Sequence, residues 1–160
     1  MNILGIETSC DETSASIISN STLISNVVYT QEIHKQYGGV VPELASQEHL
    51  NEIIDVINSA LSEAKLSLSD LDGIAVTYGP GLMGSLLIGL NFVKAMSLSL
   101  NIPFLGVNHL EGIILFKSLS KDEKKRIKDI FVPDFELEVT VQEIDEELRK
   151  IILLADYSQN

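Results

Sequence analysis

Basic side chains are scarce in the first 116 residues of this chain. Three lysines face twelve acidic residues there, a formal charge of −9, while residues 117–160 carry eight basic and eleven acidic side chains, or −3. The two parts sum to the net charge of −12, and no arginine precedes Arg126. Lys and Arg supply most of the affinity for a phosphate backbone. We therefore expect this chain to meet a nucleic acid only through partner proteins.

Cysteine, targeting signals and long apolar runs are also lacking. The single Cys10 excludes an internal disulfide and fits a reducing compartment. Met1 leads almost directly into a predicted strand without a basic region, and no apolar run reaches the roughly 20 residues of a membrane span. We expect a cytoplasmic protein without membrane contacts. Its 160 residues and 45% hydrophobic content allow one folded domain, or a lobe with an appendage.

The chain opens on a strand, a polar turn and a second strand. Residues 2–7 and 13–19 have the apolar and alternating patterns of strands, and residues 23–30 resemble a third, edge strand. The turn between the first two is rich in hydroxyls and carries Cys10 beside Asp11. Such a turn suits the phosphates of a nucleotide and their metal ion. An ordinary polar turn is the alternative, because turns generally favour Ser, Asp and Thr.

Two helices and two short strands follow. Pro42 suits the first turn of an amphipathic helix of about 20 residues. Its expected apolar face holds Leu50, Ile53, Ile54, Ile57, Leu61 and Ala64, with Glu48, Glu52, Asp55 and Glu63 outside. Residues 73–78 and 103–107 resemble buried strands. Residues 83–100 are apolar nearly all round, so we expect that helix to be buried on several faces.

Two glycine-rich segments precede these helices. Gly79-Pro80-Gly81-Leu82-Met83-Gly84-Ser85 joins a strand to a helix, where glycine lets a ligand approach and the helix amino terminus favours an anion. A tight turn without a ligand is the alternative. Gly38-Gly39 is more simply an elbow before the long helix. His34 and His49 have no metal-ligand spacing, so we expect them on the surface or on a helix face.

Four motifs together resemble one family. They are Gly5-Ile6-Glu7-Thr8-Ser9-Cys10-Asp11-Glu12-Thr13, Tyr37-Gly38-Gly39-Val40-Val41-Pro42-Glu43, the glycine loop at 79–85, and Val107-Asn108-His109-Leu110-Glu111-Gly112. In this order they resemble the amino-terminal lobe of the TsaD family of tRNA threonylcarbamoyladenosine synthases, over residues 1 to about 112. The resemblance implies an α/β, ribonuclease-H-like lobe of the actin, Hsp70 and sugar-kinase superfamily. We expect a mixed five-stranded sheet with flanking helices.

The resemblance also implies a site. Asp11 would be catalytic, and threonylcarbamoyl-adenylate or ATP would be held by Ser9, Cys10, Gly79, Gly81 and Gly84. His109 would be a ligand of the family's iron or zinc. Ile113 stands where the family has a second histidine, and the second lobe with its carboxylate ligand has no room in the remaining 48 residues. The metal is therefore not expected to be retained, which leaves enzyme activity uncertain.

Composition changes after Gly112, so we expect domains at 1–112 and 113–160. The second would be a divergent α/β tail, with a helix at 121–128, a strand at 135–141 and an amphipathic helix at 143–154 whose stripe holds Ile144, Leu148, Ile151 and Ile152. Its origin could be native, frameshifted or engineered. Translating the neighbouring DNA would separate these origins.

Two functions remain open beside an artificial fusion. The chain could be the lobe of the transferase, inactive alone. It could instead be a non-catalytic partner of the same pathway, binding other proteins of threonylcarbamoyladenosine (t6A) synthesis through its helices. Loss of the second lobe would expose the apolar helix at 83–100, so a homodimer or heterodimer is expected.

Overall fold

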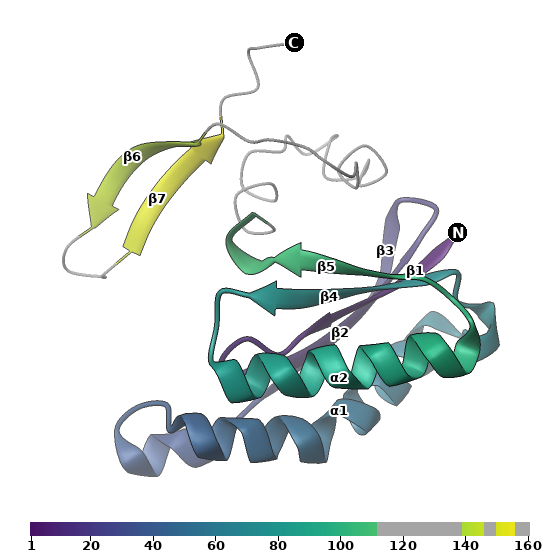
Figure 1. Cartoon of the computed structure of the whole chain (residues 1–160), viewed down its shortest axis with the longest axis horizontal. Coiled ribbons are helices and arrows are strands. Elements are labelled where there is room, and N and C mark those ends of the chain that lie inside the picture. The colour runs from purple at the N-terminus through teal and green to yellow at the C-terminus, as the bar shows by residue number, and fades with distance from the viewer. Residues whose placement is uncertain (112–138, 146–149, 156–160) are drawn as a thin grey trace. The chain divides into compact units, whose positions relative to one another are not determined.

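The computed structural model describes residues 1–111, 139–145 and 150–155, in two compact units, Met1–His109 and Leu110–Asn160. The first unit is a sheet with two long helices (Figure 1). Its elements are β1 (Asn2–Glu7), β2 (Glu12–Ser19), β3 (Thr22–Thr30), the 3-10 helix η1 (Glu32–Tyr37), α1 (Pro42–Ala64), the 3-10 helix η2 (Leu68–Asp70), β4 (Gly73–Gly79), α2 (Met83–Leu100) and β5 (Phe104–Asn108).

The sheet has five strands in the order β3-β2-β1-β4-β5. β1 pairs antiparallel with β2 and parallel with β4, and β4 pairs parallel with β5. A two-residue turn joins β2 to β3, with Asn20 and Ser21 both at left-handed φ values of 47° and 68°, which suits the right-handed twist of paired strands. The predicted mixed five-stranded sheet with flanking helices is confirmed.

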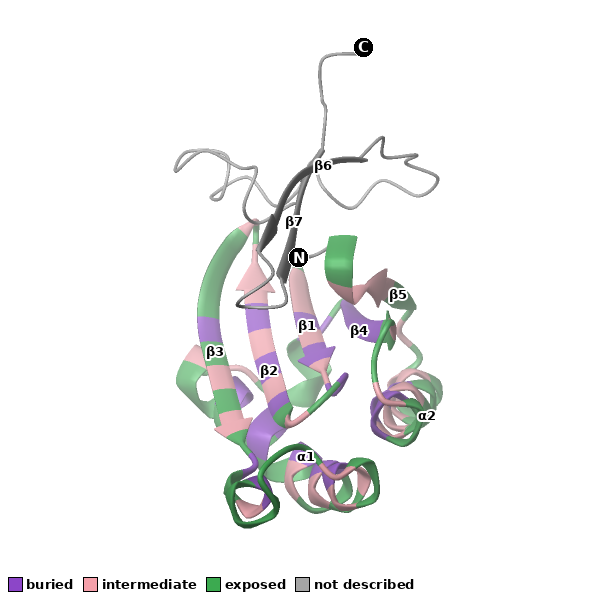
Figure 2. Cartoon of the chain, turned by 90° about the vertical axis from the view of Figure 1, so that its left-hand side faces the viewer, coloured by how far each residue is buried: buried purple, intermediate pink, exposed green. Residues whose placement is uncertain are grey.

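The core lies between the sheet and the two helices. Leu4 and Ile6 of β1, Ile17 of β2 and Val76 of β4 are buried in one cluster with residues of α1 and α2. α1 covers β2 and β3, and α2 covers β4. Figure 2 shows the buried residues on these strands and on the helices. The two helices therefore cover one face of the sheet, and the polar residues at the ends of its strands are left to form a site.

The helices differ from expectation in what they bury. On α1, Ile53, Ile57 and Leu61 are buried as predicted, but Leu50 and Ile54 are 62% and 55% exposed. Their places are taken by Ala45, His49, Val56 and Ala60. On α2 the prediction of burial on several faces is wrong: Met83 and Leu98 are 74% and 84% exposed. The described residues cover only one side of α2.

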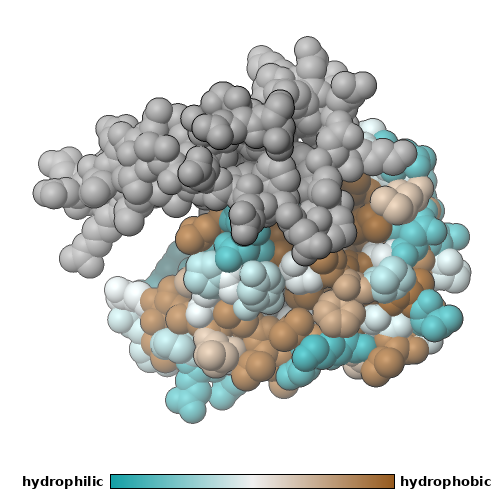
Figure 3. Space-filling model, turned by 45° about the horizontal axis from the view of Figure 1, so that its top comes forward, coloured by the Kyte–Doolittle hydropathy of each residue, from teal (hydrophilic) through white to brown (hydrophobic). Residues whose placement is uncertain are grey.

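By length and composition α2 could also cross a membrane, the one such helix among the described residues. In this fold it packs on β4 and α1. The hydrophobic side chains that remain on the visible surface are interspersed with polar ones (Figure 3).

In the second unit the structure describes two strands, β6 (Val139–Asp145) and β7 (Lys150–Ala155). They pair antiparallel, with Ile144 opposite Ile151. The predicted helix at 143–154 is therefore wrong, and the predicted strand at 135–141 overlaps β6. Alternating and β-branched residues favour strand pairing here over a helical stripe. The predicted helix at 121–128 lies outside the described residues, and the domain boundary at 112 stays a prediction.

Candidate functional site

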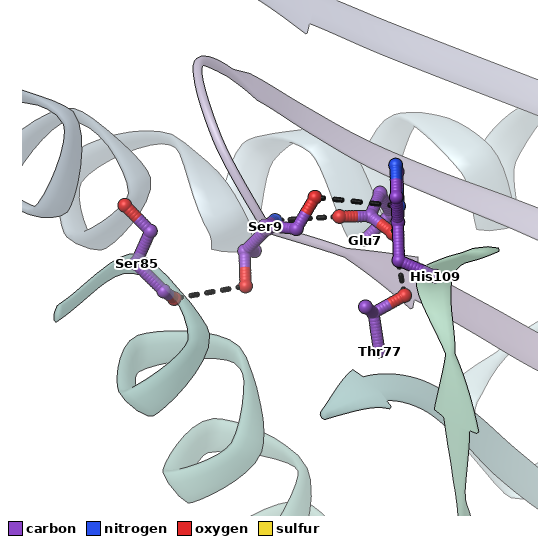
Figure 4. A network of polar contacts seen from close by, with 6 residues as sticks. Glu7, Ser9, Thr77, Ser85 and His109 are labelled. Carbon is purple, nitrogen blue, oxygen red and sulfur yellow. Dashed lines mark hydrogen bonds and ion pairs between the residues drawn. The ribbon is translucent and has the colours of Figure 1, made fainter. Parts of the chain in front are cut away.

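The parallel strands β1, β4 and β5 end at one edge of the sheet, and polar side chains meet there (Figure 4). Glu7 ends β1, Thr77 lies near the end of β4, and His109 directly follows β5. Because ligands in α/β folds bind outside the carboxyl ends of parallel strands, this edge is the candidate site.

Glu7 is the centre of the network. Its Oε1 accepts a hydrogen bond from the Ser9 backbone N–H at 2.5 Å, and its Oε2 accepts one from the Thr77 hydroxyl at 2.5 Å. The Nδ1 of His109 lies 3.0 Å from the same Oε2 and 3.4 Å from the Ser9 Oγ. Burial alone would raise the pKa of Glu7, but hydrogen bonds from Ser9, Thr77 and His109 outweigh it and lower the pKa. The carboxylate is thus ionised at neutral pH.

The start of α2 is fixed to the turn after β1. The Leu82 N–H donates to the Ser9 carbonyl at 2.8 Å, and the Thr8 hydroxyl donates to the Ser85 carbonyl at 2.9 Å. A Cβ at Gly81 would come within 2.5 Å of the Ser9 carbonyl oxygen, so only glycine allows this approach.

The two other glycines of the loop have different surroundings. A Cβ at Gly84 would meet Ser46 of α1, whereas one at Gly79 would meet open space. Packing accounts for Gly81 without a ligand, and at Gly84 a Cβ would require the Ser46 side chain to move. Nucleotide binding by Gly79, Gly81 and Gly84 stays a prediction.

A second polar network, formed by His49 of α1, supports the turn between β1 and β2. The Nε2 of His49 donates to the Cys10 carbonyl at 3.0 Å, and its Nδ1 lies 2.7 Å from the Thr13 hydroxyl. His49 is fully buried, and burial lowers its pKa in spite of the bond to Cys10. The expectation of a surface or helix-face histidine missed this structural role. α1 supplies a buried neutral histidine that positions the turn.

His34 is also buried, contrary to the same expectation. Its Nε2 lies 2.9 Å from the Gln31 side-chain oxygen, and its Nδ1 accepts the Val41 N–H at 3.3 Å. Gln31 in turn donates its backbone N–H to the Asp11 carbonyl at 3.0 Å. Neither histidine has the spacing of a metal ligand. Both instead take part in hydrogen bonds that support the turn.

The tip of the turn carries the remaining candidates. Asp11 is half-buried, and Glu12 is exposed, as expected. Cys10 is exposed, and partial burial of its thiol together with the neighbouring Asp11 raises the thiol pKa. A raised pKa keeps the thiol protonated, so Cys10 is not a reactive thiolate.

The structure thus brings Ser9 and His109 together, residues 100 positions apart in the chain. The sequence interpretation missed Glu7 and Thr77 as members of the site. Glu7 had a signal: it is a carboxylate at the end of the first strand, directly before the polar turn. Thr77 had none, since a threonine in a buried strand has no unusual pattern.

The described residues do not fit the metal implied by the family. A tight site needs three or four protein ligands, and the described residues hold no group of three His, Cys, Asp or Glu side chains suited to one. Around His109 the Nδ1 is already occupied by Glu7, which leaves one nitrogen. Iron or zinc binding at His109 therefore stays a prediction that this geometry does not support.

Comparisons with known proteins agree on one family. The family model of TsaD, tRNA N6-adenosine threonylcarbamoyltransferase, matches residues 22–127. The enzyme of that name from Desulfitobacterium hafniense is 58% identical over 116 residues, covering 71% of this chain and 34% of the relative. The one from Christiangramia forsetii is 50% identical over 123 residues, covering 77% of this chain and 36% of the relative. The chain spans about a third of the length of these relatives.

Solved structures support the fold. YeaZ from Pseudomonas aeruginosa superposes with a TM-score of 0.57 at 20% identity, covering 77% of this chain and 52% of that one. This likeness agrees with the ribonuclease-H-like fold class that the family resemblance implied. The TsaD family model covers residues 22–127, more than half of the chain, and we conclude that this chain belongs to the TsaD family.

Proposed function

We propose that this chain is the amino-terminal lobe of a transferase that moves a threonylcarbamoyl group from its adenylate to N6 of adenosine 37 in tRNA. The observation that carries this proposal is the 50–58% identity to enzymes of that name over their amino-terminal third. In this role Asp11 is the catalytic candidate. Ser9, Cys10, Gly79, Gly81 and Gly84 form one wall of the site for threonylcarbamoyl-adenylate or ATP.

The lobe is inactive by itself in this proposal. Electrostatic stabilisation of a transition state is strong only in a site that excludes water. Here the candidate side chains lie along one edge of one sheet, and Cys10 and Glu12 at the turn are exposed. A second lobe must close the site, and it must also bring the ligands that His109 lacks.

The tRNA is reached through partners in the cytoplasm. The lobe has three lysines against twelve acidic residues up to position 116. Like charge repels a phosphate backbone, so the basic surface must belong to another protein of t6A synthesis.

A reconstituted reaction tests this function. The purified chain, mixed with the other proteins of t6A synthesis, ATP, threonine, bicarbonate and tRNA, should give no modified nucleoside. The complete Desulfitobacterium hafniense relative in place of the chain is the positive control. Product formed by the chain without any other family member would refute its inactivity.

Metal content tests the same proposal from another side. After dialysis we expect less than stoichiometric iron or zinc, because the described residues offer His109 alone. Ile113→His, which restores the family's histidine pair, should raise zinc retention but not activity. One tightly held metal ion per unsubstituted chain would contradict this expectation and would point to ligands beyond residue 111.

A second candidate function is a binding module that pairs with a copy of itself or with another protein of the pathway. It is favoured by exposed apolar side chains on both long helices: Leu50 and Ile54 on α1, and Met83, Leu87 and Leu98 on α2. Exposed apolar side chains commonly become interfaces where they lie together on a surface.

Light scattering tests this second candidate. We expect a dimer at micromolar concentration, converted to a monomer by the double variant Leu50→Ser, Leu87→Ser. Leu23→Ser on β3 is the matched control, since Leu23 is 54% exposed but lies on the edge strand rather than on the helices. A monomeric unsubstituted chain would remove self-pairing as a function.

A further inference from the structure

The carboxylate of Glu7, at the end of β1, contacts Thr77 near the end of β4 and His109 directly after β5. Both oxygens of Glu7 are acceptors: Oε1 serves the Ser9 N–H, and Oε2 serves the Thr77 hydroxyl and the Nδ1 of His109. The side chains of Glu7 and His109 are each about one-third exposed, so the pair lies at the border of the fold rather than in its core. Figure 4 shows the imidazole directed at this carboxylate through one nitrogen, with the other directed away.

Both oxygens of Glu7 accept hydrogen bonds, Oε1 from the Ser9 N–H and Oε2 from the Thr77 hydroxyl, and a carboxylate oxygen in this role has no hydrogen to donate. The Nδ1 at 3.0 Å from Oε2 must therefore carry the hydrogen, and in the neutral ring the electron pair is then on Nε2. We propose that Glu7 is a positioning residue that holds His109 as the Nδ1–H tautomer and so presents Nε2 as an acceptor at the sheet edge.

The proposal has a consequence for the ligand, and this consequence rests on the proposed function. A neutral Nε2 without hydrogen accepts a hydrogen bond from an amine, amide or hydroxyl, and it repels a phosphate oxygen. His109 therefore suits an N–H or O–H group of the substrate rather than a phosphate oxygen.

Ser9 is the competing partner of Nδ1. A hydroxyl can donate as well as accept, so a bond from the Ser9 Oγ to Nδ1 would place the hydrogen on Nε2 and reverse the proposal. The distances favour Glu7, at 3.0 Å against 3.4 Å for Ser9.

The chain contains its own controls, because it has only three histidines. The Nε2 of His49 faces the Cys10 carbonyl, which can only accept, and the Nδ1 of His34 accepts the Val41 N–H. Both of these rings must therefore be Nε2–H tautomers. His109 alone is expected to be the opposite tautomer.

Long-range proton–nitrogen correlation spectra of the ¹⁵N-labelled chain, recorded at about pH 8 where histidines are usually neutral, test the proposal. We expect two Nε2–H rings and one Nδ1–H ring, and the latter should disappear in His109→Gln. An Nε2–H tautomer at His109 would overturn the proposal. The spectrum needs no substrate, so failure here leaves the proposed function standing, and a failed activity assay leaves the tautomer standing.

Two variants separate the partners of Nδ1. In Glu7→Gln, the side-chain carbonyl of the glutamine can still accept the Ser9 N–H. Its amide hydrogens then face Thr77 and His109, so we expect the His109 ring to switch to the Nε2–H form. Ser9→Ala should leave the Nδ1–H form unchanged. The opposite pattern would assign the role to Ser9. If Glu7→Gln also loses the His34 and His49 signals, it has unfolded, and the unsubstituted chain with Ser9→Ala still decides.

Discussion

The two long helices cover the same sheet in different ways. α1 carries charged residues along its length and buries seven residues, among them Ile53, Val56 and Ile57. α2 is apolar nearly throughout and buries four, of which two are Ser85 and Gly89. The apolar composition of a helix therefore does not measure its burial. α1 buries mostly large side chains, while the four buried residues of α2 are two large ones, Leu86 and Val93, and two small ones.

Close approach explains the difference. A Cβ at Gly89 would meet the Thr8 hydroxyl, which donates to the Ser85 carbonyl of the same helix. α2 is thus held against the end of β1 by a polar contact and by the absence of a side chain. Several of its large apolar residues, such as Leu87 and Leu98, are exposed. We infer that α2 positions the site, whereas α1 supplies most of the core.

The largest expected contrast is between Ile53 of α1 and Leu98 of α2. Ile53 is 1% exposed, so Ile53→Ala leaves a cavity and should lower the free energy of unfolding by about 2–5 kcal/mol. Leu98 is 84% exposed, and Leu98→Ala should change it by no more than about 0.5 kcal/mol. Urea unfolding of both variants measures this. Equal losses would show that α2 is covered in solution.

His49 gives the next effect, since its loss removes a buried polar link rather than volume alone. His49→Ala leaves the Cys10 carbonyl without its donor, at a cost of roughly 1–3 kcal/mol. Gln47→Ala, an exposed position on the same helix, is the control. Urea unfolding of the two variants decides it. A His49→Ala variant as stable as the control would mean that the turn does not depend on α1.

Gly89 tests the close approach of α2. Alanine is the better helix former by about 1 kcal/mol, but overpacking against the buried Thr8 costs about 1–3 kcal/mol. We expect Gly89→Ala to be destabilising by roughly 1 kcal/mol. Gly84→Ala meets Ser46, a partly exposed serine that can rotate, and should be nearly neutral. Thermal unfolding of the pair gives the answer, and a stabilised Gly89→Ala would contradict this account of α2.

The sequence predicted the first unit because local patterns and long-range pairing agree there. The strands at 2–7 and 13–19 and the helix that begins at Pro42 all appear near their predicted bounds. The predicted helix at 143–154 failed because Ile144 and Ile151 fit a helical stripe as well as a strand pair, and the pairing of β6 with β7 decided between them.

The site was predictable in part for a related reason. Ser9 and His109 lie in recognisable motifs. Glu7 and Thr77 act through contacts between residues 70 and 102 positions apart, and no local pattern reports such contacts. The burial of His49 was missed for the same reason, since its partners Thr13 and Cys10 lie 36 and 39 positions away.

The smallest expected effect is a pH dependence that again separates α1 from the sheet edge. Burial holds the pKa of His49 in the folded chain below its ordinary value of 6.5. The unfolded chain therefore takes up a proton first as pH falls, and the contribution of His49 to stability, complete above about pH 6.5, is lost as pH falls below it. Glu7 affects stability at lower pH. Its folded pKa is below 4.5, so its contribution to stability is complete above that pH and is lost as pH falls through the folded pKa.

Urea midpoints of the unsubstituted chain and of His49→Gln, measured from pH 8 to pH 4, separate the two groups. The difference between the two chains isolates His49 from the other histidines, because their titrations are common to both. We expect the unsubstituted chain to lose stability relative to the variant as pH falls below about 6.5. The two curves should run parallel again once His49 is protonated in the folded chain as well, where Glu7 acts in both. Parallel curves over the whole range would mean that His49 is protonated as easily in the folded chain as in the unfolded one. In that case the bond to Cys10 offsets the cost of burying its charge, and the turn is held by a cation rather than by a neutral ring.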